Sequence, residues 1–248
     1  EMTSSLVGSE MCIRDSLWSV ATTASSNGSV NCMHCSMSPL GGGIALFNML
    51  LGEVIFGGLG CGLYGMLMFA MITVFLCGLM VGRTPEFLGK KIEAREVRWS
   101  MVGVLLPGIT VLLMSGLAAA TEVGRESICN AGPHGLTEIL YCFGSQAGNN
   151  GSAFAGLAVG DTPFYSVLGG LAMLLARFGA IIPVMIIAGS MVSKKTAPPA
   201  QGTMATDNLM FMVLLVAVVL IVGALTFFPA LALGPILEHL LLYSGTML

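Results

Sequence analysis

The tripeptide Asn-Gly-Ser occurs twice in this sequence, and its residue types suit an ion held by neutral oxygens. The copies are residues 27–29 and 150–152, in "TTASSNGSVN" and "SQAGNNGSAF". Because neither stretch holds Asp or Glu, the ligands would be backbone carbonyls, serine hydroxyls and asparagine amide oxygens. Gly28 and Gly151 permit conformations that aim successive carbonyls inward. Carbonyl rings of this kind replace the hydration shell of potassium in selective filters.

The elements around these tripeptides belong to a membrane protein. Hydrophobic residues make up 55% of the 248 residues and charged residues only 9%, whereas soluble domains average about 25% charged residues. A membrane-spanning helix needs about 20 apolar residues. Four stretches qualify: Leu63–Gly82, Met101–Ala120, Phe164–Val192 and Leu209–Gly234.

The second tripeptide follows a helix too short to cross the bilayer. The segment from Pro133 to about Ala147 has roughly a dozen residues, which as a helix span about 18 Å. The turn after it must therefore return the chain to the same side, and non-helical backbone at that depth is tolerated only in a protein interior or a water-filled cavity. The turn is predicted to line a pore, and the partly negative C-terminus of the short helix favours a cation there. Similar surroundings of both copies predict a repeat of helix, short helix, polar turn and helix.

Basic residues set the expected topology. Seven of the ten Lys and Arg residues fall in two connections, around residues 83–98 and 194–195, which the positive-inside rule places in the cytoplasm. Residues 121–163 are then extracytoplasmic. The net charge of −3 is too small to indicate a charged partner, and no nucleic acid is expected.

Two arginines are candidates for the ion path. Arg177 lies near the centre of an apolar stretch, where an ionised side chain is costly and is by default functional. We expect it below the filter, as a positive barrier or a coupling element, with a structural ion pair as the alternative. Arg83 ends another apolar stretch, and topology alone would also explain it.

A Cys-x-x-Cys pair is the basis of a competing hypothesis. Cys32 and Cys35 flank His34 and would suit a redox or metal site, as in a membrane-embedded enzyme. No second ligand pair accompanies them, so chance spacing is favoured. Metal analysis separates the two hypotheses.

Longer strings resemble one family, the potassium-binding A subunits of the bacterial Kdp potassium-transporting ATPases, in the superfamily of potassium transporters. They include "GLMVGRTPEFLGKKIEAREV", "NNGSAFAGL", "ARFGAIIPV" and "GALTFFPALALGPILEHL", and the resemblance covers roughly residues 17–240. One departure is Cys35, where the family often has an acidic residue. Carried over by position, the resemblance implies two potassium filter segments: Ser26, Asn27, Gly28 and Ser29, and Asn149, Asn150, Gly151 and Ser152.

The resemblance implies an all-α polytopic membrane protein with re-entrant filter loops, about two of the family's four pore-loop repeats. Residues 17–99 would form the third unit, residues 100–195 the fourth, and residues 196–248 a linker and terminal membrane helix. Residues 1–16 resemble nothing expected before a pore loop, which indicates a truncated or chimeric sequence or a divergent variant.

The implied function is potassium capture and translocation in the bacterial inner membrane. The sequence has no phosphate-binding loop and no Asp-Lys-Thr-Gly-Thr motif, so ATP hydrolysis is expected in a separate catalytic B subunit, with C and F subunits completing the complex. This chain would be non-catalytic, with potassium as its transported substrate. The alternative is a stand-alone potassium channel or secondary transporter built from the same pore-loop unit.

Overall fold

Long apolar helices form the frame of the molecule. A computed structural model describes residues 2–52, 54, 57, 61–82, 85–155, 157, 162–196 and 205–244. Four helical segments in this part of the chain are long and apolar enough to cross a membrane, as predicted. They contain the helices α3 (Cys61–Val81), α4 (Ala94–Ala120), α7 (Pro163–Ser193) and α8 (Leu209–Leu231).

The remaining helices and strands lie beside this frame. They are α1 (Met2–Ala24), η1 (His34–Ser36), α2 (Pro39–Leu50), β1 (Glu86–Phe87), β2 (Lys90–Lys91), α5 (Glu122–Glu126), α6 (Gly132–Gly148), η2 (Ala232–Ile236) and α9 (Leu237–Tyr243). The two strands form an antiparallel hairpin. Helix α6 has 17 residues, more than the expected dozen, and its length of about 25 Å still falls short of a hydrocarbon core of about 30 Å.

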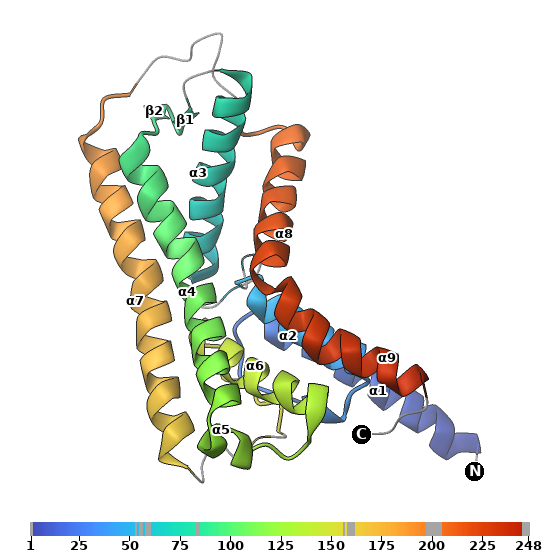
Figure 1. Cartoon of the computed structure of the whole chain (residues 1–248). Helices are drawn as coiled ribbons and strands as arrows, with labels where there is room; N and C mark the ends of the chain where they lie inside the picture. Colours follow the sequence, from blue (N-terminus) through green and yellow to red (C-terminus); the bar gives the residue numbers. More distant parts are fainter. Residues whose placement is uncertain are drawn as a thin grey trace.

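The core lies where the short helices meet the long ones. Helices α4 and α7 pack side by side, and α6 lies across their lower half in Figure 1. Helix α2 packs against the other side of α6, and α1 packs against α2. Tyr141 and Phe143 of α6, Tyr165 of α7 and Leu46 of α2 are fully buried. By contrast, large apolar side chains are exposed along α7 and α8, as suits contact with lipid; they include Val167, Leu174, Met185, Val213, Val216 and Leu225.

Both basic connections lie at one end of the molecule, as the topology requires (Figure 1). The Lys194 ammonium donates to the Glu96 carboxylate at 2.7 Å and to the Lys91 carbonyl at 2.9 Å. Glu96 also accepts from the backbone N–H of Glu93 at 2.8 Å in a capping box. This cap explains why α4 begins at Ala94, seven residues before the apolar stretch.

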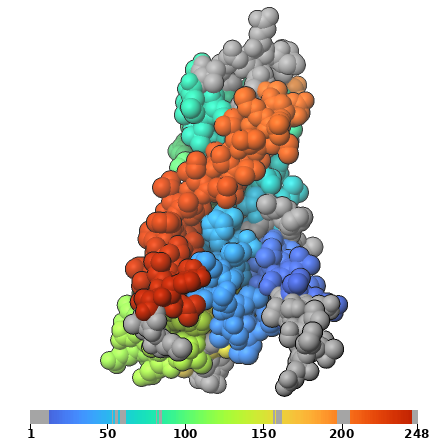
Figure 2. Space-filling model, turned by 90° about the vertical axis from the view of Figure 1, so that its right-hand side faces the viewer, coloured from blue at the N-terminus to red at the C-terminus, as the bar shows by residue number. Residues whose placement is uncertain are grey.

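The last apolar stretch bends at Gly234, the residue at which the sequence predicted the membrane helix to end. Helix α8 ends at Leu231, the wider turn η2 follows, and Gly234 has non-helical angles of φ −93° and ψ −105°. Because Pro229 and Pro235 cannot donate backbone hydrogen bonds, the helix changes direction here. Helix α9 then continues obliquely beside α2 (Figures 1 and 2). A Cβ on Gly43 of α2 would lie 2.8 Å from Pro235, so glycine permits this packing.

The backbone shows no break at the expected boundary after residue 16. Helix α1 runs without interruption from Met2 to Ala24. The expected third unit therefore begins within a helix.

Candidate functional site

Two loops follow helices α1 and α6 and begin with the same left-handed turn. Ser26 and Asn149, at equivalent positions, are left-handed with φ of 57° and 53°. The next residue in each loop reaches back five positions: Asn27 N–H donates to Thr22 O at 3.1 Å, and Asn150 N–H to Ser145 O at 2.9 Å. The backbone therefore matches the sequence repeat over these two residues, whereas at the next one Gly151 is left-handed with φ +89° and Gly28 is not.

Side-chain hydrogen bonds inside the two loops also correspond. The Thr22 hydroxyl donates to Ser29 O and the Ser145 hydroxyl to Ser152 O, both at 2.7 Å. The amide oxygen of Asn27 accepts from Ser29 N–H at 3.0 Å, and that of Asn150 from Ser152 N–H at 3.1 Å. The asparagine oxygens thus shape the loops from inside.

The loops touch each other at their glycines. A Cβ on Gly28 would lie 3.0 Å from the carbonyl carbon of Gly151, and a Cβ on Gly151, which has φ +89°, would lie 3.4 Å from Gly28 Cα. The Ser26 hydroxyl donates to Gly148 O at 3.2 Å, and the Asn150 amide to Thr22 O at 3.2 Å. The structure thus brings the two predicted filter segments into contact.

Backbone carbonyls remain as the available ligands. Within the described part of the chain, the carbonyl oxygens of Gly28 and Gly151 accept no hydrogen bond. Neither loop contains a charged residue. Both loops follow helix C-termini, whose partly negative ends favour a cation. The arrangement can therefore coordinate a monovalent cation through neutral oxygens.

Hydrogen bonds from neighbouring residues hold the loop of residues 149–152, which we call the fourth-unit loop after its expected place in the repeat; residues 26–29 are likewise the third-unit loop. The sequence did not predict this role for the residues concerned. Tyr141 Oη lies 3.0 Å from Ser152 Oγ and 2.6 Å from His34 Nδ1. His34 is 1% exposed, and burial lowers its pKa. The neutral His34 imidazole is therefore joined through Tyr141 to Ser152 of the fourth-unit loop.

Cavities lie beside the fourth-unit loop. One of about 460 Å³ is lined by Gly151 and Ser152 together with Glu138. A second of about 130 Å³ is lined by Asn149, Pro107 and Arg177. The structure thus places Arg177 on a cavity that reaches the loop backbone. Arg83 lies outside the described residues.

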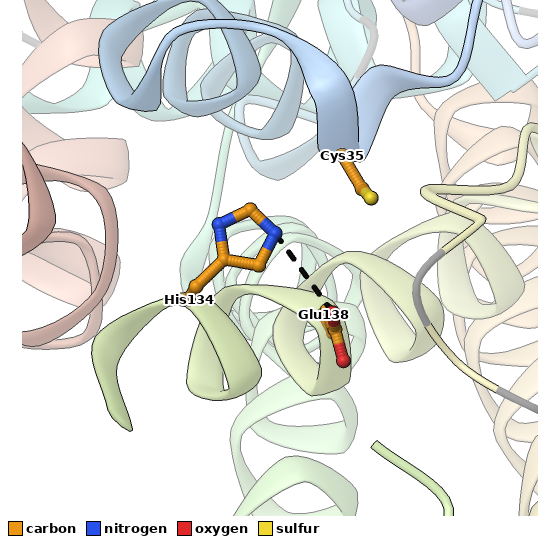
Figure 3. Close-up of side chains that lie close together, drawn as sticks. All are labelled: Cys35, His134 and Glu138. Atoms are coloured by element: carbon orange, nitrogen blue, oxygen red, sulfur yellow. Dashed lines mark ion pairs between the residues drawn. The ribbon is translucent and has the colours of Figure 1, made fainter. Parts of the chain in front are cut away.

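The cysteine pair does not form a joint site with His34. The His34 imidazole contacts Tyr141, whereas the Cys35 thiol lies beside His134 and Glu138 (Figure 3). Burial and the nearby carboxylates Glu138 and Glu238 raise the pKa of the Cys35 thiol. This arrangement argues against a redox or metal site made of Cys32, His34 and Cys35, on which the enzyme hypothesis depends.

Comparison with known proteins identifies the family. A family profile described as "Potassium-transporting ATPase A subunit" matches residues 6–240. Over 94% of its length the chain is 53% identical to the "Potassium-transporting ATPase potassium-binding subunit" of Leptospira interrogans serovar copenhageni, covering 42% of that protein. The protein of the same name in Sorangium cellulosum is 57% identical over 90% of this chain and 38% of its own length. The one in Pectobacterium carotovorum is 54% identical over 92% of this chain and 40% of its own length. The chain spans about two fifths of the length of these relatives. This chain belongs to the potassium-transporting ATPase A subunit family.

Proposed function

We infer that this chain is part of a potassium-binding and translocating subunit of an ATP-driven uptake complex. The observation that carries the proposal is the pair of equivalent, uncharged loops in contact at Gly28 and Gly151. Relatives named "Potassium-transporting ATPase potassium-binding subunit" support the choice of ion. In this proposal the carbonyls of residues 26–29 and 149–152 replace part of the hydration shell of potassium.

Two loops supply only part of a closed ring of ligands. Asn27, Gly28, Ser29 and Gly151 are exposed, so their free edges can face further loops. Because the chain spans about two fifths of its relatives, we assign the remaining ligands to two further pore-loop units of a longer protein.

Potassium would continue from the filter toward the cavity lined by Arg177. The positive charge of a guanidinium beside this path would repel a cation and so oppose its free passage. The ion would then stay on the filter side until a partner accepts it. The proposed partners are a catalytic B subunit that hydrolyses ATP, with C and F subunits, in the bacterial inner membrane. This chain would then be a non-catalytic subunit.

A stand-alone potassium channel or secondary transporter is the second candidate, because the pore-loop geometry alone suits it equally. Co-purification separates the two. A stable complex with a P-type ATPase subunit supports the uptake complex, whereas potassium flux without such a partner supports the alternative.

The filter assignment is tested by replacing Gly151 with Ala or Ser in the complete protein. A side chain at φ +89° costs about 1–2 kcal/mol. If the ion-free loop relaxes and the ion-bound loop cannot, this strain weakens affinity by up to about tenfold. We expect weaker potassium affinity and reduced selectivity against rubidium, ammonium and sodium, measured as ion-dependent uptake. Gly170→Ala in α7 is the matched control, since nothing lies within 4 Å of an added Cβ there. Unchanged affinity and selectivity in the Gly151 variants would refute the assignment.

A further inference from the structure

A sulfur, a nitrogen and a carboxylate oxygen converge beside the third-unit segment. Cys35 belongs to η1, and His134 and Glu138 lie one turn apart on the same face of α6. The candidate ligand atoms of these three residues all lie within 4.8 Å of one another. In Figure 3 the thiol projects from η1 toward the space that the imidazole and the carboxylate border.

The imidazole is already oriented for such a role. Its Nδ1 lies 2.8 Å from Glu238 Oε1 of α9, and its Nε2 lies 3.8 Å from Glu138 Oε1. When Nδ1–H donates to Glu238, the Nε2 lone pair points at the cluster. Histidine ligands of metals usually donate their other N–H to a carboxylate in this way, which fixes the tautomer and the ring orientation.

The carboxylate of Glu138 is held equally firmly. It is fully buried and accepts from the Cys129 N–H at 3.1 Å and from the Asn130 amide at 2.6 Å. These bonds fix its position relative to His134. The backbone bend at Gly234 has a consequence here, because it directs α9 so that Glu238 reaches the same histidine.

The charge balance favours a cation. Glu138 and Glu238 place two carboxylates around one histidine, and in the described part of the chain neither forms an ion pair with Lys or Arg. A divalent cation would supply two positive charges, enough to neutralise the Glu138 carboxylate and the Cys35 thiolate as its ligands. Glu238, which is hydrogen-bonded to His134, would keep its charge outside this set of ligands.

We propose that Cys35, His134 and Glu138 bind a zinc-class divalent cation, with Glu238 positioning His134. Sulfur and imidazole donors with one carboxylate suit Zn²⁺, and three protein ligands leave a fourth position for water. The bound ion would tie the segment after the third-unit loop to the helix that carries the fourth-unit loop. The proposal does not depend on potassium as the transported ion.

Cobalt binding to the complete protein in detergent, after treatment with a chelator, tests the site. Co²⁺ reports a thiolate ligand through a sulfur-to-metal charge-transfer band. We expect one equivalent to bind with that band and Zn²⁺ to displace it. Cys35→Asp retains a metal ligand but has no sulfur, so this variant should bind cobalt without the band. Glu238→Gln should weaken binding about 10-fold to 100-fold.

Matched thiol variants identify the ligand. Cys32→Ser, in the same segment, and Cys77→Ser, in α3, should leave the band unchanged. A band that persists in Cys35→Asp, or that disappears in Cys32→Ser, would overturn the proposal. So would the absence of saturable binding to a correctly folded protein, which would leave an ion pair network of His134 with its two glutamates.

Discussion

The two loops, residues 26–29 and 149–152, have corresponding internal hydrogen bonds but very different surroundings. In the fourth-unit loop Asn150 is 4% exposed and Ser152 is 3% exposed, with Tyr141 and Ser145 bonded behind them. In the third-unit loop residues 27–29 are exposed, and Trp18 and Thr22 supply the side-chain bonds to Ser29 O. The internal hydrogen bonds of a loop therefore depend on its own sequence, whereas its burial depends on the segments that lie against it.

Replacing the equivalent hydroxyls should show the largest difference between the loops. Ser145 Oγ donates to Ser152 O and accepts from Gly151 N–H at 3.1 Å. Ser145→Ala leaves both backbone groups without that partner, at a cost of about 1–3 kcal/mol for the buried Ser152 carbonyl and less for the partly exposed Gly151 N–H. We expect a clearly lower thermal midpoint in detergent and weaker potassium affinity in uptake assays.

Thr22→Val is the matched change in the third-unit loop. Its effect should stay near 1 kcal/mol, because the Trp18 indole N–H still donates to Ser29 O at 3.0 Å. Equal losses in Ser145→Ala and Thr22→Val would show that the surroundings do not distinguish the loops.

Tyr141→Phe tests the support behind the fourth-unit loop. The change removes the hydroxyl between His34 Nδ1 and Ser152 Oγ. His34 Nδ1 loses this partner, whereas Ser152 Oγ keeps its bond to the Asn150 amide oxygen at 2.5 Å. We expect a loss of about 1–2 kcal/mol in stability, read as a lower thermal midpoint, together with weaker potassium affinity. Trp18→Phe is the control, since it removes one bond to an exposed carbonyl. Should the control cost as much as Tyr141→Phe, the buried chain through His34 would have no special role.

The sequence predicts the membrane spans and the paired turns, because both depend on residues that are close together in the chain. Apolar length predicts the four spans, and the repeated tripeptide predicts paired turns in which Gly28 and Gly151 allow close approach. The bend at Gly234 also has a local signal in Pro229 and Pro235, which interrupt the helical hydrogen bonds. The predicted end of the last membrane helix at Gly234 coincides with this bend.

Contacts between distant segments have no such signal. His34 and Tyr141 are 107 positions apart, and His134 and Glu238 are 104 apart. Hydrophobic periodicity reports which face of an element is buried, but not which partner it meets. The sequence therefore paired His34 with Cys32 and Cys35, its neighbours in the chain, whereas the fold joins His34 to Tyr141 and Cys35 to His134.

The smallest expected effect comes from replacing the left-handed residue that begins one loop with the residue found in the other. Ser26 and Asn149 occupy the same left-handed position, which asparagine adopts more readily than serine. Ser26→Asn should therefore lower the backbone strain but lose the hydroxyl bonds to Gly148 O at 3.2 Å and Asn149 O at 3.4 Å. The two effects oppose each other, so we expect a net change below about 1 kcal/mol in the thermal midpoint, with unchanged potassium affinity. A larger destabilisation would mean that the Ser26 hydroxyl holds the two loops together, and that the third-unit loop depends on its neighbour as much as the fourth-unit loop depends on the core.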